Sequence, residues 1–200
     1  MKKYFYLLFI LFTLIGCSEY KPHEPKNYPN SNTDIVAFGD SLTYGYGAAQ
    51  DESYPAHLSQ MLGREIINLG VSGDTSAMGL ARISEIKKYS PYMVLIEFSA
   101  NDFFRQVPKD QTENNLREIV RQVQDMGAIA VLVDTGGAYP MDAYTKIQKQ
   151  IVKDYNTLFV PAIMGGIYNK KALMSDNIHP NDKGYKIVAE RVKKVIEDYL

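Results

Sequence analysis

The chain has 200 residues, of which 46% are hydrophobic and 22% charged, and its formal net charge is −1. This composition suits one globular domain with a full core, and the lack of a basic excess argues against a nucleic acid partner. A single cysteine excludes an intramolecular disulfide.

The first residues indicate an exported lipoprotein. Met1, Lys2 and Lys3 precede an apolar run over 4–15, which is shorter than the roughly 20 residues of a membrane-spanning helix. Leu14-Ile15-Gly16-Cys17 resembles the bacterial lipobox, whose cysteine is lipidated. We therefore expect a lipoprotein signal peptide over 1–16 and a membrane-anchored lipoprotein of the bacterial cell envelope, on its periplasmic or surface face. A plain signal peptide or an uncleaved anchor remains the alternative.

Residues 17–33 predict a lipidated N-terminus at Cys17 followed by a flexible tether. The segment holds Pro22, Pro25 and Pro29 with almost nothing apolar, so it cannot bury enough surface to fold. Its last few residues could instead pack along the domain surface. His23 lies in this segment and is given no role.

From residue 34 onward, short apolar runs alternate with longer amphipathic stretches. The apolar runs predict strands at 35–38, 65–69, 93–98, 128–133 and 158–160. The stretches between them predict helices at 53–62, 76–88, 112–126 and 144–155, and a last helix has its apolar face at Tyr185, Val188, Val192, Val195 and Tyr199. This alternation favours βαβ units in a single domain over 34–200, with a parallel sheet covered on both faces.

Four polar segments hold the candidate functional residues. Gly39–Leu42, Gly70–Thr75 and Ser99–Asp102 each follow a predicted strand, and Asp176–His179 lies in the loop before the last helix. In open α/β sheets, ligands bind beyond the carboxyl ends of the strands. We therefore expect these segments to meet at one edge of the sheet.

The residue types in these segments match the needs of acyl transfer. A serine hydroxyl such as that of Ser41 is a weak nucleophile that needs a base, and His179 is suited to that work. Asp176 can orient the histidine and stabilise its charged form. Asn101 and the backbone N–H groups of Ser41 and Gly73 can donate to a developing oxyanion.

The same segments resemble the signature blocks of the SGNH (also called GDSL) hydrolase family, and the resemblance covers nearly the whole chain from residue 35. Phe38–Thr43, Ser72–Ser76 and Gly79–Arg82 are most similar to the bacterial thioesterase I / lysophospholipase L1 / arylesterase group. The resemblance implies a three-layer α/β/α sandwich, flavodoxin-like, with a five-stranded parallel sheet. It also implies a triad of Ser41, Asp176 and His179, an oxyanion hole of Ser41, Gly73 and Asn101, and no metal or other cofactor.

One block departs from the pattern of this group. The third block usually reads Gly-Gly-Asn-Asp, whereas here it reads Ser99-Ala100-Asn101-Asp102. A left-handed backbone at Ala100 would be costly for a residue with a side chain. A small side chain fits at position 100, so only a positive φ there would change the shape of the oxyanion hole.

Other polar and aromatic residues near these segments have structural interpretations. We expect the Asp40, Asp74 and Asp102 carboxylates to brace loops, and His57 to be a surface or partly buried helix residue. Four aromatic residues either line an acyl or aromatic-alcohol pocket or pack the loops: Tyr44, Tyr46, Phe103 and Phe104. Residues 165–168 are placed where a mobile lip of the cleft could lie.

These observations predict a serine esterase that hydrolyses carboxylic esters or thioesters. Export favours lysophospholipids or other acyl-lipid esters as substrates, and lipidation of Cys17 would make the membrane a partner. A deacetylase of envelope polysaccharide or peptidoglycan is the alternative. A surface lipoprotein that keeps the fold as a non-catalytic binding module is a third possibility.

Overall fold

The computed structural model describes residues 24–137 and 139–200. The predicted signal peptide, the lipidation site at Cys17 and His23 lie outside the described residues. Within the described ranges, none of the helices is both long enough and apolar enough to cross a bilayer.

The centre of the fold is a sheet of five parallel strands in the order β2-β1-β3-β4-β5. The strands are β1 (Asp34–Gly39), β2 (Ile66–Gly70), β3 (Pro91–Glu97), β4 (Ile129–Val133) and β5 (Leu158–Val160). At its carboxyl end, Gly39 of β1 is in register with Gly70 of β2 and Glu97 of β3. The loops that follow these three strands therefore begin side by side.

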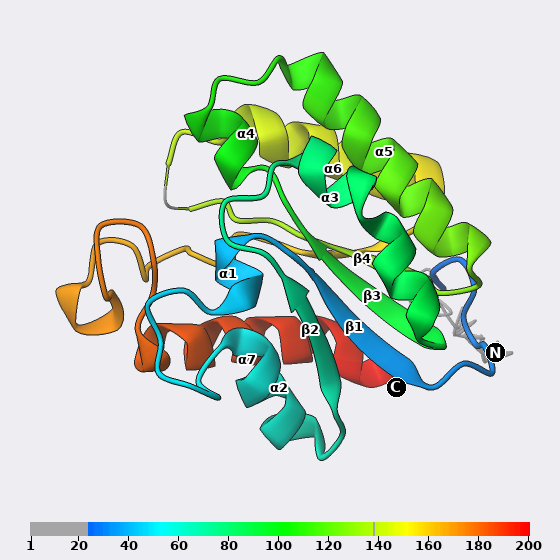
Figure 1. The fold of residues 1–200 in the computed structure, drawn as a ribbon, viewed down its shortest axis with the longest axis horizontal. Helices are drawn as coiled ribbons and strands as arrows, with labels where there is room; N and C mark the ends of the chain where they lie inside the picture. The colour runs from blue at the N-terminus through cyan, green and yellow to red at the C-terminus, as the bar shows by residue number, and fades with distance from the viewer. Residues whose placement is uncertain (1–23, 138) are drawn as a thin grey trace, which may run out of the picture.

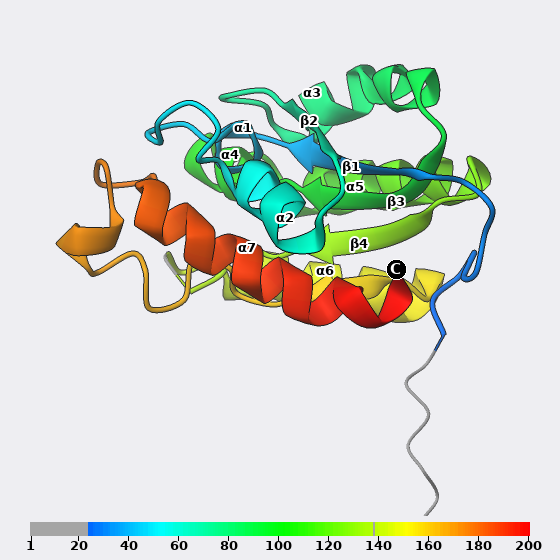
Figure 2. The same ribbon diagram turned by 90° about the horizontal axis from the view of Figure 1, so that it is seen from below.

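Helices cover both faces of the sheet (Figures 1 and 2). One face is covered by α2 (Tyr54–Leu62) and α7 (Asp182–Ile196), and the other by α3 (Ser76–Ala81), α5 (Lys109–Asp125) and α6 (Asp142–Tyr155). The shorter elements are α1 (Ser41–Tyr44), α4 (Ala100–Phe104), and the 3-10 helices at Ile83–Lys88, Lys171–Leu173 and Glu197–Tyr199. The predicted three-layer arrangement with a five-stranded parallel sheet is confirmed.

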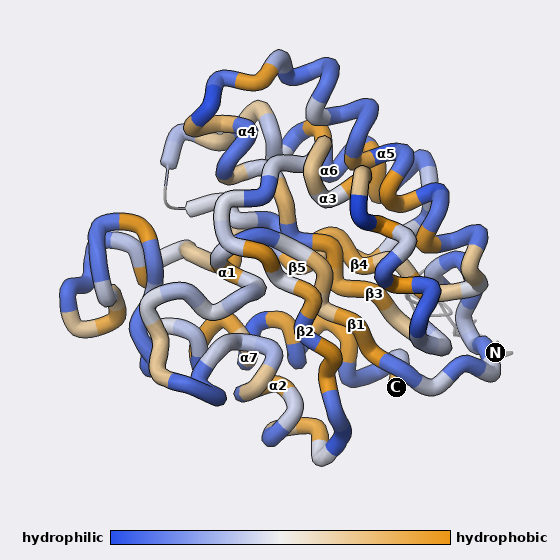
Figure 3. The backbone as a smooth tube through the Cα atoms, viewed as in Figure 1, coloured by the Kyte–Doolittle hydropathy of each residue, from blue (hydrophilic) through white to orange (hydrophobic). Residues whose placement is uncertain are grey.

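The strands are apolar throughout because both of their faces are buried. In β1, Ile35 and Ala37 belong to the core beneath α2 and α7, whereas Val36 and Phe38 belong to the core beneath α3 and α5. All four side chains are fully buried. In Figure 3 the strands accordingly form an orange, hydrophobic centre, and blue segments are concentrated in the surrounding helices and loops.

Two elements differ from the sequence prediction. The helix predicted over 76–88 divides at Arg82, whose backbone (φ −107°, ψ 14°) ends α3 before a 3-10 helix begins. The short helices α1 and α4 follow β1 and β3 directly and were not predicted, because four or five residues are too few to show a helical period.

The contacts of residues 24–33 show that the predicted tether is shorter than expected. Lys26 N donates to Asn156 O at 2.9 Å, and Asn27 Nδ2 donates to Gln124 O and Ala128 O, each at 2.9 Å. These bonds attach the segment to the domain, so the expectation of a free tether up to residue 33 is wrong for residues 24–33. The described chain starts at the end of the molecule opposite to α1 (Figure 1).

Candidate active site

Ser41, His179 and Asp176 form a continuous hydrogen-bonded chain. Ser41 begins α1 immediately after β1, and its Oγ lies 3.1 Å from His179 Nε2. On the other side of the ring, His179 Nδ1 lies 2.8 Å from Asp176 Oδ2. A proton on Nδ1 would be donated to the carboxylate, which leaves the lone pair of Nε2 to accept the serine proton.

The Asp176 loop organises its own geometry. Asp176 Oδ1 accepts hydrogen bonds from Ile178 N at 2.7 Å and from His179 N at 2.6 Å, which folds the loop into an Asx-type turn. Partial burial would raise the pKa of Asp176, but the bonds from the His179 ring and from these two N–H groups outweigh it and hold the pKa below its usual value. The carboxylate is therefore ionised at neutral pH.

Asp40 fixes the turn that presents Ser41. Its Oδ1 caps α1 by accepting from Leu42 N at 3.0 Å, and the Ser41 hydroxyl lies 3.5 Å from the same oxygen. Gly45 ends α1 with φ +91°, a conformation that glycine adopts without steric cost. The prediction that Asp40 braces this loop is confirmed by these contacts.

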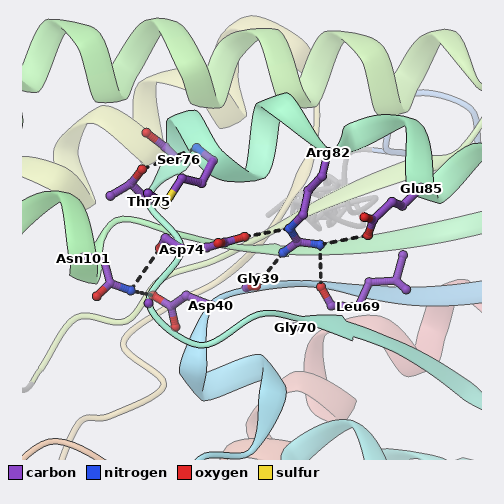
Figure 4. A network of polar contacts seen from close by, with 12 residues as sticks. Gly39, Asp40, Leu69, Gly70, Asp74, Thr75, Ser76, Arg82, Glu85 and Asn101 are labelled. Atoms are coloured by element: carbon purple, nitrogen blue, oxygen red, sulfur yellow. Dashed lines mark hydrogen bonds and ion pairs between the residues drawn. The ribbon is translucent and has the colours of Figure 1, made fainter.

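The three candidate oxyanion donors lie on three adjacent loops, but they differ in availability. Among the described residues, Ser41 N and Gly73 N have no hydrogen-bond acceptor, and Gly73 has φ +87°. Asn101 Nδ2, in contrast, donates to Asp40 Oδ2 and to Asp74 O, both at 3.0 Å (Figure 4). Because an amide NH₂ has two hydrogens, Asn101 can reach a third acceptor only by sharing one of them.

The left-handed backbone lies one residue before the expected position. Ser99 has φ +126°, whereas Ala100 is the first residue of α4. Ala100 therefore does not have the positive φ that would have strained it, and the cost of a positive φ falls on Ser99 instead. The Ser99 side chain is fully buried, and its Oγ accepts from Gln148 Nε2 at 3.4 Å, which links the turn to α6.

Comparison with known proteins places this geometry in a family. Residues 37–187 match the model of the GDSL-like lipase/acylhydrolase family. The chain belongs to this family. It is 30% identical over 172 residues to thioesterase 1/protease 1/lysophospholipase L1 of Escherichia coli K12, with 82% of this chain and 83% of the relative covered.

Two further comparisons extend the likeness. A crystal structure of TesA superposes with a TM-score of 0.78 at 25% identity, covering 84% of this chain and all of the TesA chain. An acetylxylan esterase of Geobacillus stearothermophilus is 27% identical over 209 residues, covering 92% of this chain and 90% of the relative. The chain is thus a GDSL-type acylhydrolase with esterases and thioesterases among its relatives.

Arg82 ties together the loops of this GDSL site, although no role was predicted for it from its position in the sequence. Its guanidinium donates to Leu69 O at 2.9 Å and to Gly39 O at 3.0 Å, the carbonyls at the ends of β2 and β1 (Figure 4). Its Nε pairs with Asp74 Oδ2 at 2.6 Å, next to Gly73. The planar fork of arginine allows all three contacts at once. The sequence signal that could have indicated a role for Arg82 was its place in the Gly79–Arg82 block, which resembles a block of the family.

The remaining acidic residues and histidine of the prediction lie at structural positions. Asp102 is buried, and it accepts from Ser76 N at 2.8 Å and from Thr112 Oγ1 at 2.9 Å, which joins α4 to α3 and α5. The buried His57 contacts Asp182 O at 3.2 Å, away from Ser41. In the part of the chain that the structure describes, no three His, Cys, Asp or Glu side chains gather closely enough to hold a metal ion.

An apolar cavity lies beside Ser41 and His179. Leu42 and Ile178, the neighbours of these two residues in the chain, belong to its lining, which comprises Leu42, Ala100, Phe104, Thr135, Tyr139, Met141, Met164 and Ile178. The centre of a water-sized sphere can occupy only about 20 Å³ of it. The space as it stands therefore fits a small acyl group, and a longer chain requires side chains to move.

The aromatic residues divide between this cavity and its surroundings. Phe104 lines the cavity and meets Tyr139 edge-on, with ring centroids 4.9 Å apart. Tyr139 also contacts Tyr168, at 4.7 Å, so the predicted lip at 165–168 reaches the cavity wall through Tyr168. Tyr46 packs against the His179 ring at 4.5 Å. The exposed side chain of Tyr44 does not line the cavity.

Proposed function

We propose that this GDSL family member is a serine esterase that hydrolyses carboxylic esters or thioesters. The observation that carries the proposal is the unbroken chain from Asp176 through His179 to Ser41, with distances of 2.8 and 3.1 Å. Both lie within the range in which a nucleophile is activated by a base that a carboxylate orients.

The proposed reaction uses each of these residues in turn. Ser41 Oγ attacks the ester carbonyl while His179 Nε2 takes its proton, and Asp176 stabilises the imidazolium. The tetrahedral oxyanion accepts hydrogen bonds from Ser41 N and Gly73 N, neither of which has an acceptor among the described residues. Each such donor contributes about 3 kcal/mol to transition-state stabilisation in comparable sites.

The acyl-enzyme is then hydrolysed by the same groups. His179 passes its proton to the departing alkoxide or thiolate, which leaves with the pair of electrons of the broken bond. Water attacks the acyl-enzyme with His179 again acting as base, and Ser41 regains its proton. Asn101 joins the oxyanion hole when one of its amide hydrogens is shared between Asp40 or Asp74 O and the oxyanion.

An acyl-lipid ester, such as a lysophospholipid, is the substrate class we propose first. The apolar lining beside Ser41 and His179 suits a hydrocarbon chain. The E. coli relative carries thioesterase and lysophospholipase in its name. For a chain longer than a few carbons, the cavity must open at Tyr139 or Phe104, which pack edge-on across it.

Removal of acetyl groups from an envelope polysaccharide or peptidoglycan is the second candidate. The small size of the cavity favours it, because 20 Å³ accommodates an acetyl methyl without rearrangement. A relative named acetylxylan esterase supports the same chemistry on a polysaccharide.

We also propose that Cys17 is lipidated and anchors the protein in the bacterial cell envelope. Residues 18–23 separate this cysteine from the first described residue, Glu24, and the seven residue steps between the two span at most about 25 Å. The first described segment starts at the end of the molecule opposite to α1, which carries Ser41 (Figure 1). Attachment of the anchor at that end leaves Ser41 at the far end of the domain from the lipidated cysteine.

Two measurements test the function and its substrate class. Ser41→Ala is expected to abolish p-nitrophenyl ester hydrolysis and labelling by a fluorophosphonate probe, with Ser59→Ala on α2 as the matched control. Turnover by the Ser41 variant would refute the assignment, and a wild-type protein that takes no label would favour a non-catalytic binding module. Rates from acetate to decanoate esters then separate the two substrate classes.

A further inference from the structure

Two carboxyl groups are buried side by side beneath the nucleophile. Asp40 and Glu97 have no exposed surface. Glu97 ends β3, and its Oε2 accepts from Asp40 N at 3.3 Å and from Thr43 Oγ1 at 2.9 Å. Its second oxygen, Oε1, has no hydrogen-bond partner in the described part of the chain. A buried carboxylate oxygen without a hydrogen-bond donor costs free energy, so the structure favours a protonated Glu97 over an ionised one.

The pair has no lysine or arginine partner in the part of the chain that the structure describes. The titratable groups that face them are Tyr54 from α2, Tyr185 from α7 and His179 from the loop before α7. Two adjacent buried carboxylates would repel each other, and one proton shared between them removes that repulsion.

The proton belongs on Glu97. Burial raises the pKa of Glu97 well above its usual value, and the neighbouring negative charge of Asp40 raises it further. Burial also raises the pKa of Asp40, to about 6, but bonds from Leu42 N and Asn101 stabilise its ionised form. Of the two groups, Glu97 therefore holds the proton and Asp40 is the ionised partner.

This assignment gives each of the surrounding hydrogen bonds a direction. The single hydroxyl hydrogen of Thr43 goes to Glu97, so the bond of 3.2 Å between Tyr54 OH and Thr43 Oγ1 has the tyrosine as donor. Glu97 then donates its own proton to Asp40. The chain thus runs from Tyr54 on α2 to the carboxylate that accepts from Leu42 N and Asn101 Nδ2.

We propose that Glu97 is a positioning residue that, as a neutral acid, holds the Asp40 carboxylate where it orients the Ser41 turn and the Asn101 amide. The proposal rests on the esterase function proposed above. Glu97 touches neither Ser41 nor a substrate, and it acts through Asp40. Its effect is therefore expected in kcat, because the oxyanion donors are needed in the transition state, and not in KM.

The pH dependence follows from the raised pKa of Glu97. Below that pKa the proton is present and the arrangement is intact. As the pH rises through it, Glu97 ionises, the bond to Asp40 is lost, and the two carboxylates repel. We expect kcat to fall on the alkaline side for this reason.

Two substitutions at the same position test the proposal. Glu97→Gln keeps a donor for Asp40 and an acceptor for Thr43 but cannot ionise, so kcat at pH 7 should stay within about threefold and the alkaline fall should disappear. Glu97→Met fills a similar volume without either group, and kcat should drop by about 30-fold or more at unchanged KM. Glu118→Gln on the exposed face of α5 is the control.

A second readout is independent of activity. Infrared difference spectra of the wild type and Glu97→Gln at pH 7 should show one protonated carboxyl C=O band that the variant lacks. An absent band, an alkaline limb retained in Glu97→Gln, or equal losses in the Gln and Met variants would overturn the proposal. If the wild type hydrolyses no ester, the proposed function fails, whereas the infrared band still decides where the proton lies.

Discussion

Replacement of Asp176 by asparagine should harm the reaction more than its removal. Asp176 Oδ1 accepts from two backbone N–H groups, those of Ile178 and His179. In Asp176→Asn the amide oxygen keeps these bonds, which turns the NH₂ group toward His179 Nδ1. The ring must then carry its proton on Nε2, where it cannot accept the proton of Ser41. In Asp176→Ala, water replaces the carboxylate and permits either tautomer.

The magnitudes of these two losses can be worked from the exposure of Asp176. Its side chain is 45% exposed, so its attraction to the imidazolium is screened and lies between about 1 and 4 kcal/mol. Loss of that attraction in Asp176→Ala corresponds to a decrease of roughly 5- to 10³-fold in kcat. An enforced wrong tautomer costs about 10⁴-fold, or about 5.5 kcal/mol.

The assay is kcat/KM for a p-nitrophenyl ester, measured for both variants with thermal unfolding as a check of folding. Asp176→Asn should be the slower enzyme by about tenfold or more. If the alanine variant were equally slow or slower, the carboxylate would act mainly by its charge or by folding its loop, and the tautomer argument would be refuted.

Two further predictions concern the supports of the site. A Cβ at Gly70 would lie 2.1 Å from Tyr44 N in α1, so Gly70→Ala should lower stability by about 3 kcal/mol and kcat by about 10²-fold. Gly166 has open space around it, so Gly166→Ala should lower stability by only about 1 kcal/mol and leave kcat unchanged. Arg82→Lys keeps the charge but not the fork, and urea unfolding should show a loss of about 3 kcal/mol, whereas the exposed Arg121→Lys should leave the unfolding midpoint unchanged. Equal effects within either pair would contradict the packing described for Gly70 or the clamp assigned to Arg82.

The fold could be predicted from the sequence because its signals are local. Each strand is a short apolar run, and each long helix shows a 3.6-residue period, so the order of elements and the parallel sheet followed directly. The proximity of Ser41 to Asp176 and His179 was also predictable. The segment of Ser41 follows a predicted strand, and the segment of Asp176 and His179 lies in the loop before the last helix. Residues 24–33 were misjudged because their attachment depends on side-chain bonds such as those of Asn27, which composition does not reveal.

The supporting residues escaped prediction because their roles are set by distant partners. Glu97 looks like the polar end of an apolar strand, and only the register that sets it beside Gly39 shows that it meets Asp40. Arg82 reads as an ordinary helix residue until the ends of β1 and β2 supply it with carbonyls.

The turn after β3 shows how the site tolerates an unusual residue. Ser99 adopts φ +126° although it has a side chain, which costs about 1–3 kcal/mol. Its hydroxyl is bonded by Gln148, and the next residues start α4, which aims Asn101 at Asp40 and Asp74. A glycine at this position would relieve the strain, but it would lose the bond to α6 and add backbone freedom beside the amide. Ser99 thus lowers the stability of the fold but holds Asn101 in a fixed position.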